Sequence, residues 1–239
     1  MNDEINSHEV VSEADWLKAR KKLLTREKAL TRKASELSEA RRSLPWVKVT
    51  KAYEFEDANG KVTLADLFEG RSQLIVYHFM FGPDDSAGCR HCSLRADGFN
   101  GINVHLKHRD VTMIAVSRAP YQKLAAYKKR MGWQFHWVSC GNTDFNLDYH
   151  VSFPPEAVTQ GKAFFNYAAQ DPGHSEREGH SVFYRDKLGT VFHSYSCYSR
   201  GNELFNIHYH YLDVVPKGRD ENGRGPYWVL RHDEYDQSS

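Results

Sequence analysis

The stretch from residue 73 to residue 100 constrains the fold more than any other part of the chain. It reads QLIVYHFMFGPDDSAGCRHCSLRADGFN. The apolar run at residues 74–81 is rich in Val, Ile, Tyr and Phe, as is typical of a buried strand. Gly, Pro and Asp residues then break regular structure, and apolar residues at helical spacing follow. The sequence therefore predicts that Cys89 and Cys92 lie where a buried strand ends and a helix begins.

This location favours ionisation of a cysteine. At a helix N-terminus, unpaired backbone N–H groups and the positive end of the helix dipole stabilise a thiolate. Arg90 and His91 add positive charge, and Cys92 lies almost one turn further on, close enough to attack a disulfide formed on Cys89. A strand, a turn and a Cys-x-x-Cys helix in an intracellular protein indicate a thioredoxin-like redox site. We therefore expect Cys89 and Cys92 to be catalytic, with Arg90 and His91 supporting them.

The same spacing also occurs in structural zinc sites. Zinc needs two further ligands, and the remaining cysteines, Cys140 and Cys197, stand alone rather than as a pair, although 13 histidines keep this alternative open. Unreactive thiols are a third alternative. Covalent haem requires a histidine directly after the second cysteine, where this chain has Ser93. We expect neither a metal nor an organic cofactor.

The composition is that of a folded, soluble protein. Of the 239 residues, 40% are hydrophobic and 13% aromatic, enough for a substantial core, and the formal net charge of +1 gives no general attraction to nucleic acid or membranes. The N-terminal stretch lacks the basic and apolar regions of a secretory signal. No apolar stretch approaches the roughly 20 residues that cross a bilayer, and four cysteines with one spaced pair do not make a disulfide framework. We expect a cytoplasmic protein.

Residues 1–45 are expected to form an N-terminal helical arm. Ser12 and Asp15 resemble a capping box, and no Gly or Pro follows before Pro45. A large apolar residue recurs every seven positions, but the second apolar position of each heptad, which a coiled coil needs, is weak. An arm along its own domain is the simplest interpretation. An arm that joins two copies of the chain as a homodimer is the alternative. Nucleic-acid binding through the basic face of the helix is a weaker alternative, because no aromatic residues are interleaved with the basic ones.

The remaining chain predicts strands that alternate with helices, which is typical of an α/β fold with parallel pairing. The expected strands are residues 46–55, 74–81, 111–117 and 135–139, with a hairpin at 181–185 and 190–196, and the expected helices include 120–131 and 203–214. We expect one domain at residues 46–215, a mixed sheet flanked by helices, with an irregular insertion at about 141–180 and an extended C-terminal tail at 216–239.

This order of elements resembles the thioredoxin superfamily, in its peroxiredoxin-like arrangement. More closely, the chain is similar over nearly all of residues 10–235 to an uncharacterised family of predicted dithiol-disulfide oxidoreductases with a thioredoxin-like fold. Short motifs carry the match: residues 44–47 (LPWV), 62–68 (VTLADLF), 77–83 (YHFMFGP), 88–89 (GC), 92–93 (CS), 116–120 (VSRAP), 131–133 (MGW), 181–186 (SVFYRD) and 211–213 (YLD). The resemblance implies a redox site in which Cys89 attacks and Cys92 resolves, and it names no substrate.

Two features depart from the patterns of these relatives. Members of the family often carry Pro and a small residue between the cysteines, where this chain has Arg90 and His91. A histidine directly before the second cysteine resembles the strongly oxidising thioredoxin-fold proteins and implies a raised reduction potential. Thioredoxins also place a cis-proline just before the hairpin strand, where this chain has Gly179, His180 and Ser181.

Peroxidase activity of the peroxiredoxin type is the main alternative function. Ser86 lies three residues before Cys89, as the hydroxyl of peroxiredoxin sites does, but Pro83 is one residue closer than that motif requires. Arg118 and Arg200 are candidates for an assisting arginine because they lie near predicted strand ends. A non-catalytic binding module that uses the basic arm is a further alternative.

His78 lies inside the predicted central strand. A buried histidine there favours a hydrogen-bonded core residue over a catalytic base. For partners, we expect a protein or small-molecule thiol or disulfide, and neither a membrane nor nucleic acid.

Overall fold

The computed structural model describes residues 8–235, and the chain divides into two compact units, Met1–Pro45 and Trp46–Ser239. The first unit contains helix α1 (Glu13–Arg42). Ser12 caps this helix, because its side-chain oxygen accepts a hydrogen bond from the Asp15 backbone N–H at 3.2 Å. No residue of α1 is buried. The long N-terminal helix predicted from the sequence is therefore confirmed.

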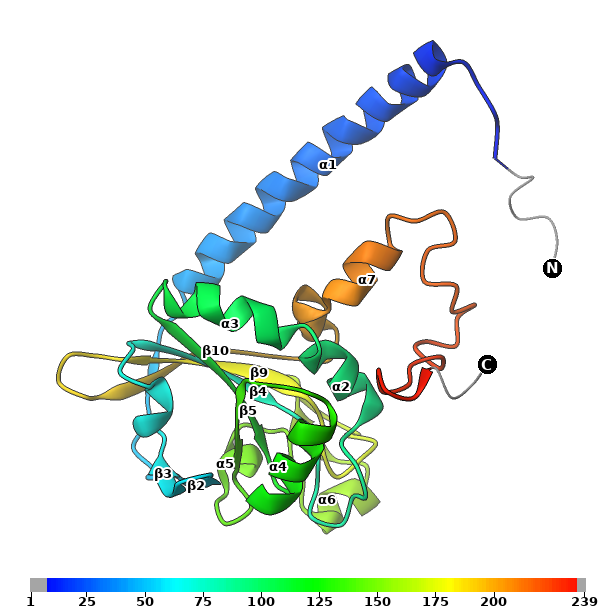
Figure 1. Ribbon diagram of the computed structural model, residues 1–239. Coiled ribbons are helices and arrows are strands. Elements are labelled where there is room, and N and C mark those ends of the chain that lie inside the picture. Colours follow the sequence, from blue (N-terminus) through cyan, green and yellow to red (C-terminus); the bar gives the residue numbers. More distant parts are fainter. Residues whose placement is uncertain (1–7, 236–239) are drawn as a thin grey trace. The chain divides into compact units, whose positions relative to one another are not determined.

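The second unit is built on an eight-stranded mixed sheet with the order β1-β10-β9-β4-β5-β6-β2-β3 (Figure 1). Its strands are β1 (Val47–Lys48), β2 (Glu54–Asp57), β3 (Gly60–Thr63), β4 (Gln73–His78), β5 (Val111–Ser117), β6 (His136–Ser139), β9 (Gly179–Arg185) and β10 (Val191–Tyr198). Strands β4, β5 and β6 run parallel, whereas β9 pairs antiparallel with both β4 and β10. A central strand with a parallel neighbour on one side and an antiparallel hairpin on the other is the thioredoxin-like arrangement. The predicted fold class is confirmed.

Helices cover the sheet and close its two cores. They are η2 (Asp66–Phe68), α2 (Arg90–Ala96), α3 (Phe99–Lys107), α4 (Tyr121–Arg130), α5 (Phe145–Asp148), α6 (Pro155–Thr159), η3 (Ser199–Phe205) and α7 (Ile207–Leu212). The predicted Cys-x-x-Cys helix is divided into α2 and α3, which are separated at Asp97 and Gly98. No helix within residues 8–235 combines the length and the apolar content needed to span a membrane.

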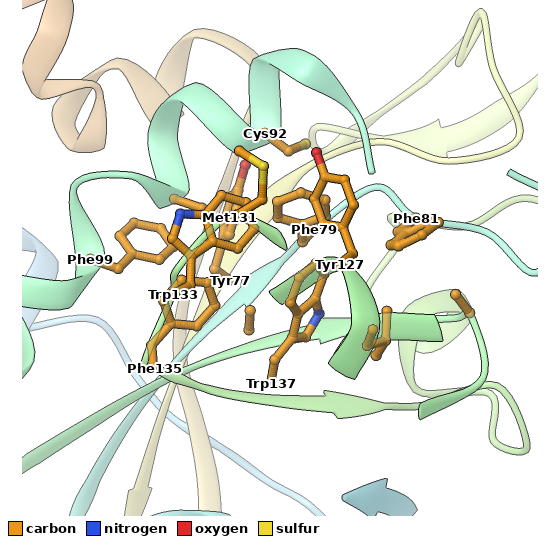
Figure 2. Close-up of a cluster of buried hydrophobic side chains, with 14 of the residues drawn as sticks. Tyr77, Phe79, Phe81, Cys92, Phe99, Tyr127, Met131, Trp133, Phe135 and Trp137 are labelled. Carbon is orange, nitrogen blue, oxygen red and sulfur yellow. The ribbon is translucent and has the colours of Figure 1, made fainter. Parts of the chain in front are cut away.

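Residues of β4 alternate between the two cores, as the two-residue period of a strand requires. Ile75 and Tyr77 face a core rich in aromatic rings, in which Cys92 is buried (Figure 2). Leu74 and Val76 face the other core. The central strand is thus covered on both faces, which explains its continuous apolar sequence.

Residues 46–55, predicted as one strand, form two strands on opposite sides of β4. β1 pairs with β10, whereas β2 pairs with β6 and β3. Between them the chain crosses the sheet, and Lys51 Nζ binds the carboxylates of Asp144 at 2.8 Å and Asp148 at 2.7 Å. The prediction was wrong because alternating apolar and polar residues suit a crossing segment as well as a strand.

Three other segments differ from their predictions. The insertion at 141–180 contains α5, α6 and a hairpin of β7 (Ala163–Phe165) and β8 (Ala168–Gln170), supported by a small apolar core of its own. The single helix predicted at 203–214 is divided into η3 and α7. Residues 216–235 are not extended, because they form turns and contact the loop after β4.

Candidate active site

Cys89 is the N-cap residue of α2, at the end of the loop that follows β4. Beyond β4 the chain stays extended, and Phe79 N donates a hydrogen bond to Val116 O at 2.9 Å. At the end of the loop, Cys89 N donates to Met80 O at 3.1 Å. Cys89 therefore lies at the point where the free N–H groups of a helix begin.

Gly88 fixes the position of the loop directly before Cys89. A Cβ atom at this residue would lie 2.8 Å from the Phe79 ring and 2.9 Å from the Tyr127 ring, so only glycine fits. The Gly88 carbonyl accepts hydrogen bonds from Arg231 Nη2 at 2.7 Å and Nε at 3.2 Å. Arg231 Nε also donates to the Tyr127 hydroxyl at 2.8 Å. The core and the C-terminal segment together hold the loop that carries Cys89.

The two cysteines are not joined by a disulfide, and their surroundings differ sharply. Cys89 is partly exposed, whereas Cys92 is 0% exposed. A hydrogen bond from Cys92 lowers the pKa of Cys89 to about 4, against the effect of burial and with help from His91 and the backbone N–H groups at the helix start. Burial raises the pKa of Cys92 well above its usual range, and the neighbouring Cys89 adds to this rise. Near neutral pH, Cys89 is the thiolate and Cys92 is the thiol.

The two residues between the cysteines play different parts. A hydrogen bond with the Cys89 sulfur raises the pKa of His91, and His91 Nε2 donates to the carbonyl of Pro226 at 3.0 Å. Arg90 is exposed, and its charge opposes protonation of His91. The supporting interaction in the structure is therefore that of His91, which is held in place by the C-terminal segment.

A carboxylate that sequence reasoning missed lies beside the buried thiol. The Cys92 sulfur lies 3.6 Å from Glu178 Oε2, and the Tyr77 hydroxyl donates to the same oxygen at 2.8 Å. Arg95 Nη1 also donates to Glu178 and lies 3.1 Å from the Tyr77 hydroxyl. Arg95 is 7% exposed and the Glu178 side chain 23%, so the guanidinium is shielded from water and the carboxylate only partly.

One sequence signal could have located Glu178. It lies three residues before the predicted hairpin strand at 181–185, and the observed strand β9 begins at Gly179, which pairs with His78 at the end of β4. The residue before Gly179 must therefore lie near the start of the Cys-x-x-Cys helix. No sequence pattern predicted that the C-terminal segment contacts the loop before Cys89, because the residues in contact lie more than one hundred positions apart.

The other residues singled out by sequence lie outside this cluster. Ser86 is exposed in the loop before Cys89. His78 is a buried core residue, as predicted: its ring nitrogens lie 2.9 Å from Asn146 Oδ1 and 2.8 Å from Ser181 Oγ. Cys140 is buried, and burial raises its pKa to about 12. The buried Cys197 sulfur donates to Asn202 Oδ1 at 3.5 Å.

Cys89 lines two cavities. The first, here called the dithiol cavity, has a volume of about 530 Å³ and is also lined by Cys92, His91 and Arg95. The second, here called the loop cavity, measures about 880 Å³ and is also lined by Arg118. Ser86 lines neither of them. The thiolate is thus reachable from two sides.

The zinc alternative finds no ligand set in the described part of the chain. Across residues 8–235, no group of three or more His, Cys, Asp and Glu side chains is arranged to hold a metal ion.

A model of the family described as "Bacterial protein of unknown function (DUF899)" matches residues 5–235. The chain belongs to this family. The DUF899 match includes the Cys-x-x-Cys motif, the insertion and nearly all of the C-terminal segment that contacts the loop before Cys89. A search of curated proteins gave no match.

Several solved peroxiredoxin structures resemble this DUF899 chain at a distance. Peroxidoxin BcpB from Mycobacterium tuberculosis is 12% identical, with a TM-score of 0.44 over 69% of this chain and 94% of its own. A mutant of peroxiredoxin Q from Xanthomonas campestris is 13% identical, with a TM-score of 0.44 over 72% and 99%. The mitochondrial 2-Cys peroxiredoxin from Plasmodium falciparum is 14% identical, with a TM-score of 0.40 over 70% and 92%. Likenesses this distant carry no activity over to the chain.

Proposed function

We propose that this protein is a thiol-disulfide oxidoreductase that uses Cys89 and Cys92. The observation that carries the proposal is the asymmetry of the pair. Cys89 is partly exposed and has a lowered pKa at a helix N-terminus, whereas Cys92, three residues on, is fully buried and has a raised pKa. Thiolates attack disulfides, whereas thiols do not. The asymmetry therefore assigns attack to Cys89 and resolution to Cys92.

In the first step, the Cys89 thiolate attacks one sulfur of a substrate disulfide. A bond forms between Cys89 and that sulfur, the substrate S–S bond breaks, and one substrate thiolate leaves. The hydrogen bond from His91, which stabilises Cys89 as a thiolate, also keeps it in position beside the dithiol cavity.

In the second step, Cys92 loses its proton and attacks the Cys89 sulfur. Glu178 Oε2, at 3.6 Å from the Cys92 sulfur, accepts that proton. The second substrate thiolate leaves, and Cys89 and Cys92 are joined as a disulfide. Two electrons have passed from the dithiol to the substrate, and an external thiol reductant returns them by the same exchange in reverse.

The lowered pKa of Cys89 also affects the reduction potential of the pair. Stabilising the thiolate stabilises the reduced protein, so the Cys89–Cys92 disulfide becomes a stronger oxidant than an ordinary dithiol pair. We place this exchange in the cytoplasm, where cellular thiols are kept reduced and dithiol pairs of this kind are catalytic rather than structural.

The loop cavity favours a second reaction at the same sulfur, reduction of a peroxide, because Arg118 lines it together with Cys89. The thiolate would attack a peroxide oxygen and break the O–O bond, leaving a sulfenic acid on Cys89 and releasing an alcohol or water. Cys92 would then condense with the sulfenic acid, release water and form the same disulfide. Ser86 lies outside both cavities, so we rank this reaction second.

A redox titration with thiol trapping tests the proposed function. The protein is equilibrated in thiol–disulfide buffers of defined potential, and the remaining thiols are alkylated and mapped by mass spectrometry. We expect one two-electron transition that joins Cys89 to Cys92, and no such transition in a Cys92→Ala variant. A protein in which this disulfide never forms would contradict the proposal. Oxidation by hydrogen peroxide, but not by disulfides, would favour the peroxidase instead.

A further inference from the structure

The dithiol cavity is enclosed by segments that are far apart in the sequence. Besides α2, its walls include Phe165 and Arg177 from the insertion, Asn206 from the start of α7, and Pro226 from the C-terminal segment. Its volume of about 530 Å³ lies within the range of about 300–1,000 Å³ that is typical of small-molecule sites. Such a cavity suits a small substrate better than the broad surface of a folded protein.

Two buried polar atoms of residues that line this cavity have no hydrogen-bond partner. They are Arg95 Nε, a donor, and Asn206 Oδ1, an acceptor, and each residue is 7% exposed. Leaving a buried polar atom unpaired costs about 1–3 kcal/mol, and buried polar atoms are paired in most proteins. An amide group carries both an acceptor, which Arg95 Nε lacks, and a donor, which Asn206 Oδ1 lacks.

Arg177 adds a positive charge at the edge of the cavity. Its guanidinium lies 5.8 Å from the centre of the Phe165 ring, and its Nε donates to the carbonyl of Pro172. Among residues 8–235 it forms no ion pair, whereas Arg95 and Arg200 in the same cavity pair with Glu178 and Glu203. A guanidinium with free N–H groups binds a carboxylate well.

We propose that the dithiol cavity binds a small disulfide that carries a carboxylate and an amide near its sulfur, such as the disulfide of a short cysteine-containing peptide. The substrate sulfur meets Cys89, the amide pairs with Arg95 Nε and Asn206 Oδ1, and the carboxylate binds Arg177. This inference rests on the proposed thiol-disulfide exchange, whose two steps are unchanged. It adds the class of substrate.

The test compares two disulfides that differ in these groups. Oxidised glutathione carries carboxylates and amides, whereas bis(2-hydroxyethyl) disulfide carries neither. The pre-reduced protein is mixed with each, and formation of the Cys89–Cys92 disulfide is followed by acid quenching and alkylation. We expect an Arg177→Met variant to react with oxidised glutathione about 10-fold or more slowly, as loss of a charge-assisted hydrogen bond implies. Its rate with bis(2-hydroxyethyl) disulfide should stay within about twofold.

Two further variants make the comparison specific. Lys187→Met removes the same charge from an exposed turn away from the cavity and should change neither rate. Arg177→Lys keeps the charge and should restore part of the rate with oxidised glutathione. The proposed substrate class would be wrong if wild type and Arg177→Met react with oxidised glutathione at equal rates. It would also be wrong if a protein disulfide oxidises the wild type faster than either reagent does. If neither small disulfide oxidises Cys89, the proposed function itself is wrong.

Discussion

A Cys92→Ser variant is expected to stop at a covalent intermediate, with the substrate half joined to Cys89. The partly exposed Cys89 is the thiolate that attacks, and the fully buried Cys92 is needed only to release the second half of the substrate. A serine hydroxyl stays protonated and does not displace a thiolate, so the mixed disulfide should persist. A Cys89→Ser variant should show no adduct and no exchange above the level of buffer alone.

Intact mass measured without reductant, after mixing each variant with a disulfide, checks this result. Wild type should show the loss of two hydrogens, Cys92→Ser one substrate adduct, and Cys89→Ser neither. An adduct on the Cys89→Ser variant would mean that Cys92 attacks, and the roles assigned to the two sulfurs would have to be reversed. Cys140→Ala serves as a control, because this buried cysteine should contribute no adduct.

Replacing Glu178 by alanine is expected to destabilise the protein by about 3–5 kcal/mol. The change leaves the guanidinium of Arg95, which is 7% exposed, without its counter-charge. It also removes the acceptor of the Tyr77 hydroxyl and of the Cys92 thiol. The effect is large because an unpaired buried charge destabilises the fold by more than the intact ion pair stabilises it.

Urea unfolding of the reduced protein measures this effect. Glu54→Ala is the matched control, because Glu54 forms an exposed ion pair with Lys61 at 2.7 Å, and such pairs contribute only about 0–1 kcal/mol. If Glu178→Ala and Glu54→Ala change the free energy of unfolding equally, the buried Arg95 guanidinium does not need Glu178 as its counter-charge.

The parts of this structure that the sequence predicted depend on local patterns. Neighbouring residues are enough to recognise the apolar run before Gly82, the break after it and the helical spacing that follows. These three patterns predict β4, the loop and α2. The hairpin of β9 and β10 is predicted by the turn between two apolar segments. Together these elements were enough to predict the thioredoxin-like sheet.

The parts that were missed depend on contacts between distant residues. The break between β1 and β2 reflects their pairing with strands distant in the sequence, β10 on one side of the sheet and β6 on the other. Lys51, between the two strands, binds Asp144 and Asp148, more than ninety positions away. Glu178 reaches Cys92 only because β9 pairs with β4 in one register. The apolar pattern places Glu178 shortly before a hairpin strand, but the register that brings it to Cys92 is set by the pairing of β9 with β4.

Ionisation of Cys89 has a consequence for stability with a definite sign. Its folded-state pKa is lowered from 9.0 to about 4, so the thiolate stabilises the reduced fold fully above about pH 9. The stabilisation falls as the pH drops and is lost below about pH 4, whereas a protein with Cys89 in a disulfide has none of it. The free energy of unfolding of the reduced protein, relative to that of the oxidised protein, should therefore decrease as the pH falls from about 9 to about 4.

Titration of the thiolate absorbance of the reduced protein tests whether Cys89 is the ionised cysteine. We expect a transition with a midpoint near pH 4, several pH units below that of an ordinary cysteine, and we expect it to be absent from the Cys89→Ser variant. Cys140 should not contribute, since its pKa is raised to about 12. A midpoint near pH 9 would show that Cys89 is an ordinary thiol. A transition near pH 4 that survives in Cys89→Ser would show that another group ionises there, and either result would overturn the assignment of the thiolate to Cys89.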